Sequence, residues 1–480
     1  MKHFPLTLFA AVIVAASITS CSYDQNAEPS MAAKSSVASV DPFAVTRTDI
    51  QNVLNGLTAK PACQKMRAKT QSKQYTVSTI IDKMGKPAIY VVNYANNGGF
   101  VLVSATKKFT PMLAYSQSGN YSITGNAPDG VRNWQSDIVG TIAAVESLPE
   151  DSTGRFVDQW NGYIEKDTTV LSGGNMSMAG DEFNPDDAYN KKIDEFERAG
   201  YRVHKIGETS ITGDPKIDER LRGEAEYDTY PDYDWQKYAV VIEWTESTDE
   251  TKPNFMQTIW GQGDYKVLAQ YNHTYNQYCP VINGVCAPAG CLPVAIGQVM
   301  KYFETPSGVY DWDEMPNHFA TEETARLLHD IGIAIKAKYT SSSTSAPESE
   351  GVSYLNKYFS AYRCKKYDFD VAFNHAKNNE PALLVATTDS VGKKGSHAFL
   401  MTGGSRRTSA TYFTLFTFTG RYTYDHCYYV SPMYQQYEGY AYLNWGWDGM
   451  HNGMYLYDNF AIDDVYTSVY NISATYISKK

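Results

Sequence analysis

Three widely separated residues carry the groups of a nucleophilic active site: Cys291, His397 and Asn444. The stretch Pro293–Phe303 has the apolar spacing of an amphipathic helix with a proline in its first turn, which places Cys291 at a predicted helix N-terminus. Unpaired N–H groups and aligned peptide dipoles there favour a thiolate, the form of cysteine that attacks a carbonyl carbon. An isolated cysteine in such a helix is more often a buried structural residue, so the assignment depends on its partners.

Those partners are His397 and the pair Asn444-Trp445. His397 follows Gly395 and Ser396 at the start of a predicted strand, where small neighbours leave an imidazole open to a cleft as a proton acceptor. The carbonyl of Asn444 could fix the histidine tautomer, and the Trp445 indole could shield that bond or donate its N–H to an oxyanion. The other histidines considered are interpreted as hydrogen-bonded bystanders: His273, His318, His329, His375, His426 and His451.

Several separated motifs surround these residues, and together they span about 250 to 475. They are Trp260-Gly261-Gln262, Tyr271-Asn272, Cys279-Pro280, Ala289–Ala295, Gln298–Tyr302, Tyr310-Asp311-Trp312, His397-Ala398-Phe399 and Asn444–Gly449. With the order Cys, His, Asn, they resemble the streptopain-type cysteine proteases, which are secreted or lipoprotein zymogens with a papain-like catalytic domain. The resemblance implies a Cys291–His397 catalytic dyad, with Asn444 and Trp445 in supporting roles.

The N-terminal part resembles the inhibitory propeptide of the same family, through Tyr90–Asn93 and Gly98–Ser104. It also shows a possible helix at 48–57, three predicted strands between 75 and 103, and an amphipathic helix at 131–146 whose apolar stripe is Trp134, Ile138, Ile142 and Ala143. The expected fold is α+β: a papain-like catalytic domain with a helical part and an antiparallel β part, preceded by a small α+β propeptide domain.

Two departures from the family pattern bear on the site. No glutamine lies between Val285 and Ala289, where papain-like enzymes carry an oxyanion donor, so the candidates are the backbone N–H of Cys291, the indole N–H of Trp445 and the distant Gln262. His397 and Asn444 are 47 positions apart, and the aromatic insertion at 403–440 predicts an extra hairpin or lid beside the cleft. The replacements at Ala289, Leu292 and Ser396 remove no reacting group.

A chain of 480 residues is too long for a single hydrophobic core, so two or three domains are expected. Between 148 and 250 the sequence becomes acidic and poor in apolar clusters, with one amphipathic helix predicted over Ala188–Tyr201. The expected organisation is a signal peptide (1–20), a lipidated tether (21–41), an inhibitory propeptide domain (42–147), an acidic connecting region with the maturation site (148–250) and a catalytic domain (251–480).

The N-terminus has the pattern of an export signal. Lys2 and His3 precede the apolar stretch Leu8–Ala16, which is too short to cross a bilayer, and Ile18-Thr19-Ser20-Cys21 resembles a bacterial lipobox. Cys21 is therefore the predicted lipidation site, with an ordinary signal peptide as the alternative. The expected location is the cell envelope or cell surface, with release after processing as a further option.

The expected partners are polypeptide substrates, the chain's own propeptide as an intramolecular inhibitor, and a membrane only through the lipid anchor. A net charge of −11 argues against nucleic acid. No cofactor or metal is predicted: a zinc site from Cys279, Cys286, Cys291 and His273 lacks the usual paired spacing. Two alternatives stay open, a catalytically silent papain-fold surface lipoprotein that binds a ligand, and another acyl transfer on the same dyad.

Overall fold

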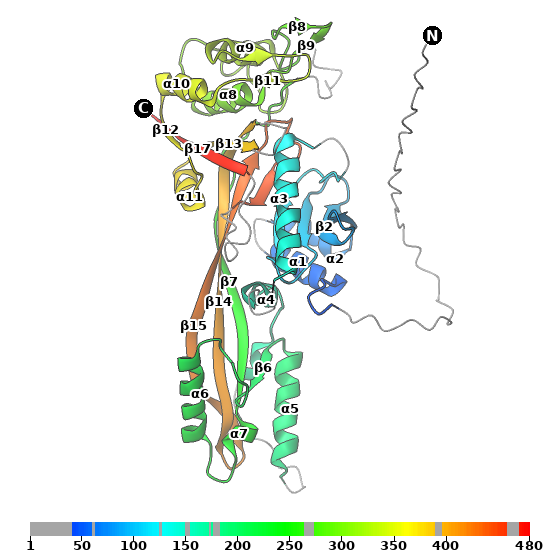
Figure 1. Ribbon diagram of the computed structural model, residues 1–480, viewed down its shortest axis with the longest axis vertical. Helices are drawn as coiled ribbons and strands as arrows, with labels where there is room; N and C mark the ends of the chain where they lie inside the picture. Colours follow the sequence, from blue (N-terminus) through cyan, green and yellow to red (C-terminus); the bar gives the residue numbers. More distant parts are fainter. Residues whose placement is uncertain are drawn as a thin grey trace, which may run out of the picture. The chain divides into compact units, whose positions relative to one another are not determined.

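The computed structural model describes residues 41–59, 63–123, 127–148, 154–171, 174–175, 183–263, 273–388, 396–457 and 470–480. The chain divides into a short unit, Met1–Pro42, and a second unit, Phe43–Lys480, that contains all of the elements below (Figure 1). The expected signal peptide, Cys21 and nearly all of the expected tether lie outside the described residues.

The N-terminal domain is a four-stranded antiparallel sheet with helices packed on it. The strands pair in the order of the sequence: β1 (Tyr75–Ile81), β2 (Pro87–Tyr94), β3 (Phe100–Ser104) and β4 (Met112–Ser116). The helices are α1 (Arg47–Ala59), α2 (Gln64–Gln71) and α3 (Asp129–Glu146). The predicted strands and both predicted helices of this region are confirmed.

Helix α3 lies against the core through an apolar stripe. Val131, Trp134, Ile138 and Ile142 recur at three- and four-residue steps and are all buried, because these steps return to one helix face. Ala143, part of the predicted stripe, is exposed instead. The helix therefore turns one face to the N-terminal core, and its first turn is free to reach another part of the molecule.

The sheet of the N-terminal domain continues into the C-terminal part. Strand β4 pairs with β16 (Gly453–Leu456), with Tyr115 opposite Met454 and Ala114 opposite Tyr455. Beyond β16 the order is β15 (Thr423–Asn444), β14 (Ser396–Gly420), β13 (Ala382–Thr388), β17 (Tyr470–Lys479) and β12 (Phe359–Cys364). Neighbouring strands along this path are antiparallel, so the predicted antiparallel sheet is confirmed.

The helical part of the C-terminal region forms a separate core. Helices α8 (Cys291–Phe303), α9 (Glu322–Ala334) and α10 (Glu348–Tyr358) lie next to one another (Figure 1) and bury Trp260, Val299 and Leu328. Two short hairpins flank them, β8 (Val281–Ile282) with β9 (Val285–Cys286) and β10 (Lys338–Tyr339) with β11 (Thr344–Ser345). A further helix, α11 (Phe369–Lys377), contacts β14. The fold is α+β, with helical and β parts as expected.

Residues 185–252 form an accessory lobe together with the insertion at 403–440, although the sequence indicated that 148–250 is mainly a connecting region. Strand β7 (Val240–Lys252) pairs with β14 along its whole length, from Lys252 opposite Gly404 to Val240 opposite Phe416. The lobe also contains α5 (Pro185–Arg198), β6 (Arg202–Lys205), α6 (Pro215–Asp228) and α7 (Trp235–Tyr238). Strands β14 and β15 pair as the extra hairpin that was predicted for the insertion, and this hairpin is the centre of a folded lobe and not a lid (Figure 1).

The helices of the lobe begin where the sequence places strong start signals. Asn184 and Asp214 are N-caps whose side chains accept hydrogen bonds from the backbone N–H of Asp186 and Lys216, and each is followed by proline at the first helical position. Before the lobe the chain forms helix α4 (Gly154–Asn161) and a 3₁₀ turn at Thr168–Leu171. The short strand β5 (Gly174–Asn175) then pairs with β15. Among the described residues, no helix combines the length and apolarity needed to cross a membrane.

Candidate active site

Cys291 is the first residue of α8, as predicted. Gly290 precedes it as the N-cap with φ 97° and ψ 145°, a backbone conformation that favours glycine. A Cβ at Gly290 would lie 2.9 Å from the Cγ2 of Thr344, whose hydroxyl donates a hydrogen bond to the carbonyl of Pro288 at 2.5 Å. The turn before the nucleophile is thereby held by the β10–β11 hairpin.

His397 lies at the start of β14 and reaches the same place. The backbone N–H of Ala398 donates a hydrogen bond to the Sγ of Cys291 at 3.4 Å. His397 is the residue before Ala398, so its backbone lies next to the thiol. The imidazole is buried, and its Nε2 donates to the carbonyl of Trp445 at 3.1 Å. The two predicted reacting residues therefore share one site, although the hydrogen bond found for the imidazole goes to Trp445 and not to the thiol.

Asn444 does not hold His397 as the sequence suggested. Its Nδ2 donates to the carbonyl of Thr258 at 2.7 Å and to Oε1 of Gln298 at 3.0 Å, and its Oδ1 accepts from the N–H of Gly446 at 3.1 Å. Both ends of the amide are thus occupied at the end of β15. The backbone carbonyl of the next residue, Trp445, accepts the hydrogen bond from the His397 imidazole instead.

Trp445 is fully buried and its indole N–H is also already used. The Nε1 donates to the carbonyl of His451 at 3.1 Å, so it is not offered to an oxyanion in this state, contrary to one of the predicted roles. The ring packs near His397, with centroids 6.4 Å apart, and against Phe399 at 4.6 Å. The indole is thus one of the aromatic rings that surround the buried imidazole.

Gln262, the distant oxyanion candidate, lies beside the nucleophile turn. Its backbone carbonyl accepts a hydrogen bond from the N–H of Ala289 at 2.6 Å, two residues before Cys291. That contact brings the Trp260-Gly261-Gln262 motif to the candidate site. An oxyanion role for Gln262 stays a prediction.

Gln298, the first residue of the motif Gln298–Tyr302, is a site residue to which the sequence analysis gave no role. It is fully buried, and its Oε1 accepts from the backbone N–H of Trp260 at 3.2 Å as well as from Asn444. It follows Cys291 by seven positions, which places both on one face of α8. That spacing was the available signal: a glutamine inside an otherwise apolar helix face needs a buried polar partner.

The N-terminal domain covers the site with the first turn of α3. A Cβ added to Gly130 would lie 2.6 Å from Cδ2 of His397 and 2.6 Å from Cζ3 of Trp445, so the backbone of α3 rests on both rings. Further along α3, the indole N–H of Trp134 donates to the carbonyl of Leu456 at 3.0 Å. The backbone of α3 therefore occupies the space directly beside the imidazole of His397.

Burial also sets the protonation of the covered pair. It raises the pKa of the Cys291 thiol, although backbone N–H groups near the sulfur act in the opposite direction. Burial lowers the pKa of His397 to about 4, against a smaller opposing effect of the Trp445 carbonyl. The Asp129 carboxylate is close enough to raise both values. The covered site therefore holds a neutral thiol and a neutral imidazole, not the thiolate–imidazolium pair needed for attack.

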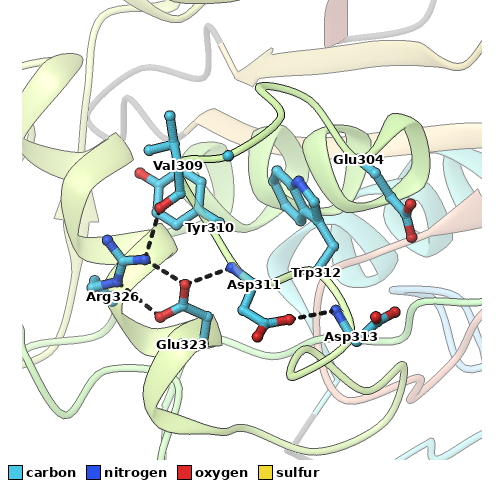
Figure 2. Close-up of a pocket in the computed structure, with 9 residues that line it drawn as sticks. Glu304, Val309, Tyr310, Asp311, Trp312, Asp313, Glu323 and Arg326 are labelled. Atoms are coloured by element: carbon cyan, nitrogen blue, oxygen red, sulfur yellow. Dashed lines mark hydrogen bonds and ion pairs between the residues drawn. The ribbon is translucent and has the colours of Figure 1, made fainter.

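A surface pocket of about 540 Å³ lies elsewhere, next to the C-terminus of α8 (Figure 2). Its wall includes an ion pair in which Nε of Arg326 donates to Glu323 at 2.9 Å, and the backbone N–H of Asp311 donates to the same carboxylate at 2.8 Å. None of its lining residues is a predicted catalytic residue: Glu304, Gly308, Val309, Tyr310, Asp311, Trp312, Asp313, Glu323 and Arg326.

The cysteines of the alternative zinc site are free where the structure describes them. Cys279 is buried, and burial raises its pKa to about 11, whereas Cys286 on β9 is partly exposed. Within the described ranges, no group of three or more His, Cys, Asp and Glu side chains is arranged to hold a metal ion.

A thiol at a helix N-terminus, a histidine at the start of a neighbouring strand and an N-terminal domain over both define a papain-like cysteine protease in covered form. Residues 57–142 match the Spi protease inhibitor family, and residues 307–455 match the peptidase C10 family. The chain is a cysteine protease made with an inhibitory propeptide, and its C-terminal match is to the peptidase C10, or streptopain, family. The C10 match contains His397, Asn444 and Trp445 and begins after Cys291.

Two solved structures are similar to the chain. A fragment of prointerpain A from Prevotella intermedia is 16% identical, with a TM-score of 0.42, over 84% of this chain and 98% of that one. Active interpain A cysteine protease from the same organism is 18% identical, with a TM-score of 0.33, over 47% of this chain and 94% of that one. No curated protein is significantly similar in sequence.

Proposed function

We propose that Cys291 is the nucleophile of this endopeptidase and His397 its general acid and base. The observation that carries the proposal is the 3.4 Å contact between the N–H of Ala398 and the Sγ of Cys291, which joins the start of β14 to the N-terminus of α8. His397 is the residue before Ala398 on β14, so the same contact places its backbone next to the nucleophile.

The reaction follows from these groups. With the site uncovered and hydrated, His397 takes the thiol proton, and the thiolate attacks the carbonyl carbon of a peptide bond. The oxyanion is stabilised by the backbone N–H of Cys291, with Gln262 as a second donor. The imidazolium protonates the leaving amine, which leaves a thioester on Cys291. His397 then removes a proton from water, which cleaves the thioester and releases the acid.

Latency follows from the position of Gly130. While α3 rests on the His397 and Trp445 rings, the imidazole stays bonded to the Trp445 carbonyl and the dyad stays neutral. Removal of the N-terminal domain would admit substrate and water together, and the pKa of His397 would return toward its ordinary value. Activation is then a single event that opens the cleft and charges the dyad.

The test compares matured protein carrying Cys291→Ala or His397→Ala with matured wild type, each cleaved by the same added protease. Hydrolysis of casein should fall by at least about 10³-fold in both variants, because the two residues act as one unit. Cys286→Ala, which removes a partly exposed thiol five residues upstream, is the matched control and should keep wild-type activity. Undiminished hydrolysis by Cys291→Ala would refute the proposal and point to another nucleophile, whereas absence of hydrolysis in the matured wild type would favour the silent binding lipoprotein.

We further propose that the protein is exported and anchored through a lipid on Cys21. The support is in the sequence: the apolar stretch Leu8–Ala16 followed by Ile18-Thr19-Ser20-Cys21. In a bacterial host, Cys21→Ala should abolish incorporation of labelled palmitate and move the protein from the membrane to the soluble fraction. Labelling that survives this substitution would contradict the anchor.

A further inference from the structure

One face of the central strand β14 is polar and buried where the N-terminal domain meets the sheet. The polar row consists of Ser405, Arg407, Ser409 and Thr411, each no more than 5% exposed. Three of them pair through hydroxyl groups with β7: Ser405 with Thr251 at 3.0 Å, Ser409 with Ser247 at 2.8 Å and Thr411 with Thr245 at 3.2 Å. Arg407 lies between Asp249 of β7 and Glu438 of β15 in the strand register.

The cover over this polar row comes from residues before 164. The hydroxyl of Tyr163 accepts a hydrogen bond from Arg407, whose guanidinium lies 4.1 Å from the centre of the Tyr163 ring. A Cβ at Gly162 would lie 3.0 Å from the hydroxyl of Ser247. The hydroxyl of Thr110, in the N-terminal domain, donates to Glu438. The contacts across this interface are thus hydroxyls, a guanidinium and carboxylates.

Helix α4, which leads into Tyr163, is packed on the N-terminal domain by its apolar side. Phe156 and Trp160 are buried there: the Phe156 ring lies 5.4 Å from that of Phe109, and the Trp160 indole donates to the Phe109 carbonyl at 2.9 Å. The Tyr163 ring lies against Gly56 of α1, where an added Cβ would meet it at 2.7 Å. Helix α4 is therefore part of the inhibitory domain's core, and the contacts with the accessory lobe that are described for the residues directly after it, Gly162 and Tyr163, are to polar side chains.

The accessory lobe, in contrast, is joined to β14 by apolar cores on both faces of the sheet. One core gathers Phe413 and Leu415 of β14 with Val241, Leu221 and Ala225. The other gathers Phe416 and Phe418 with Val240, Ile242, Phe196 and Tyr238. Loss of residues 185–239 would expose apolar side chains on both faces of β14 to water, which is strongly unfavourable in free energy.

We propose that maturation cuts the chain between Tyr163 and Pro185, so that α4 leaves with the inhibitory domain while the accessory lobe stays in the mature protease. Hydroxyl and charged groups of the polar row are solvated by water once uncovered, whereas the lobe's apolar cores are not. The inhibitory domain also packs apolar rings on β16, where Trp134 lies 4.9 Å from Tyr455, so it stays bound for a time after the cut. The position of the cut is therefore the decisive observable, and the inference rests on the zymogen function proposed above.

The experiment uses the full chain with two substitutions as mass labels. Tyr163→Ala lies just before the proposed cut, and Tyr227→Ala lies on α6 in the lobe, where the side chain is 85% exposed. After self-maturation, the intact mass of the mature protease is measured under denaturing conditions. The mature form of Tyr163→Ala should have the wild-type mass and wild-type kcat/KM, because the substitution has been removed. The mature form of Tyr227→Ala should be lighter by the tyrosine-to-alanine difference.

Either other outcome overturns the proposal. If both labels persist, α4 stays with the protease; if both are lost, the lobe is discarded. The same labels in a Cys291→Ala chain, cut by increasing amounts of thermolysin, test the inference without any self-cleavage. The first stable product should then lack residue 163 and contain residue 227. Failure of the wild type to mature itself would count against the proposed function, whereas the thermolysin product alone decides this inference.

Discussion

Substitution of Gly130 by alanine should open the covered site. The added Cβ would meet ring carbons of His397 and Trp445 at 2.6 Å, well inside the 3.4 Å at which ordinary contact begins. Both rings are buried and packed by neighbours, so they cannot move aside freely. Such overpacking costs about 1–3 kcal/mol, which shifts the balance between covered and open forms by about 5- to 150-fold. The helix preference of alanine over glycine acts in both forms and cancels while α3 stays helical.

The assay is the rate at which iodoacetamide alkylates Cys291 in the uncleaved chain, followed by peptide mass mapping because other thiols are present. Alkylation requires an open site and a thiolate, both of which the covered form suppresses. Gly130→Ala should therefore raise the Cys291 rate by about the same 5- to 150-fold factor, as long as opening limits the reaction. The rates at Cys286 and Cys427 should stay unchanged.

Gly223→Ala is the matched control. It lies on α6 of the accessory lobe, and no heavy atom lies within 4 Å of its added Cβ, so the Cys291 rate should equal that of the wild type. An unchanged Cys291 rate in Gly130→Ala, with folding shown intact by circular dichroism, would refute the contact between α3 and the dyad.

Three further predictions follow from buried polar groups. Burial lowers the pKa of His397 from 6.5 to about 4, so acid favours any state in which the imidazole is exposed. Between pH 6.5 and pH 4 the covered form should lose up to about 3 kcal/mol of stability relative to the open form. This loss should be measured in Cys291→Ala protein as faster amide hydrogen exchange of α3, after correction for intrinsic exchange rates. Gln298→Leu leaves the N–H of Trp260 without its acceptor and should lower the free energy of unfolding by about 1–3 kcal/mol in urea, with a reduced kcat in the matured enzyme and little change in KM; unchanged stability would contradict the role of this amide. Burial raises the pKa of Asp448 from 3.8 to about 7, so the protonated carboxyl stabilises the fold below about pH 4, and this stability is lost as pH rises toward 7. Asp448→Asn should raise the free energy of unfolding by up to about 4 kcal/mol at pH 8 and by almost nothing at pH 4. An equal effect at both pH values would count against this explanation.

Much of the local structure could be predicted from the sequence. The stripe of α3 and the helix after Cys291 follow from apolar spacing, and the strands of the C-terminal sheet follow from short aromatic and aliphatic runs between turn residues. The placement of Cys291 and His397 at one site was predicted from the order of the motifs. These features depend on local pattern, which a single sequence displays.

The contacts that were missed depend on pairing between distant segments. The length of the 403–440 insertion predicted an extra hairpin or lid, and the hairpin is confirmed, but its pairing with β7 was not foreseen. Phe413 to Phe418 belong to a strand that is buried on both faces, since β14 lies between β7 and β15. The acidic composition of 148–250 did not indicate β7, in which the buried residues are Val240 to Glu243 and Thr245. Asn444 was expected to hold His397, and nothing in the sequence indicated that Gln298 and Thr258 would occupy its amide nitrogen.

The most direct test of the account is reaction of the wild-type chain with an epoxide of the E-64 type, measured by intact mass and peptide mapping before and after maturation. The covered dyad predicts no adduct on the uncleaved chain. The matured enzyme should carry one adduct, on Cys291, with peptide hydrolysis lost in proportion to labelling. Full hydrolysis after complete labelling of Cys291, or an inactivating adduct on a different cysteine, would contradict the assignment of the nucleophile.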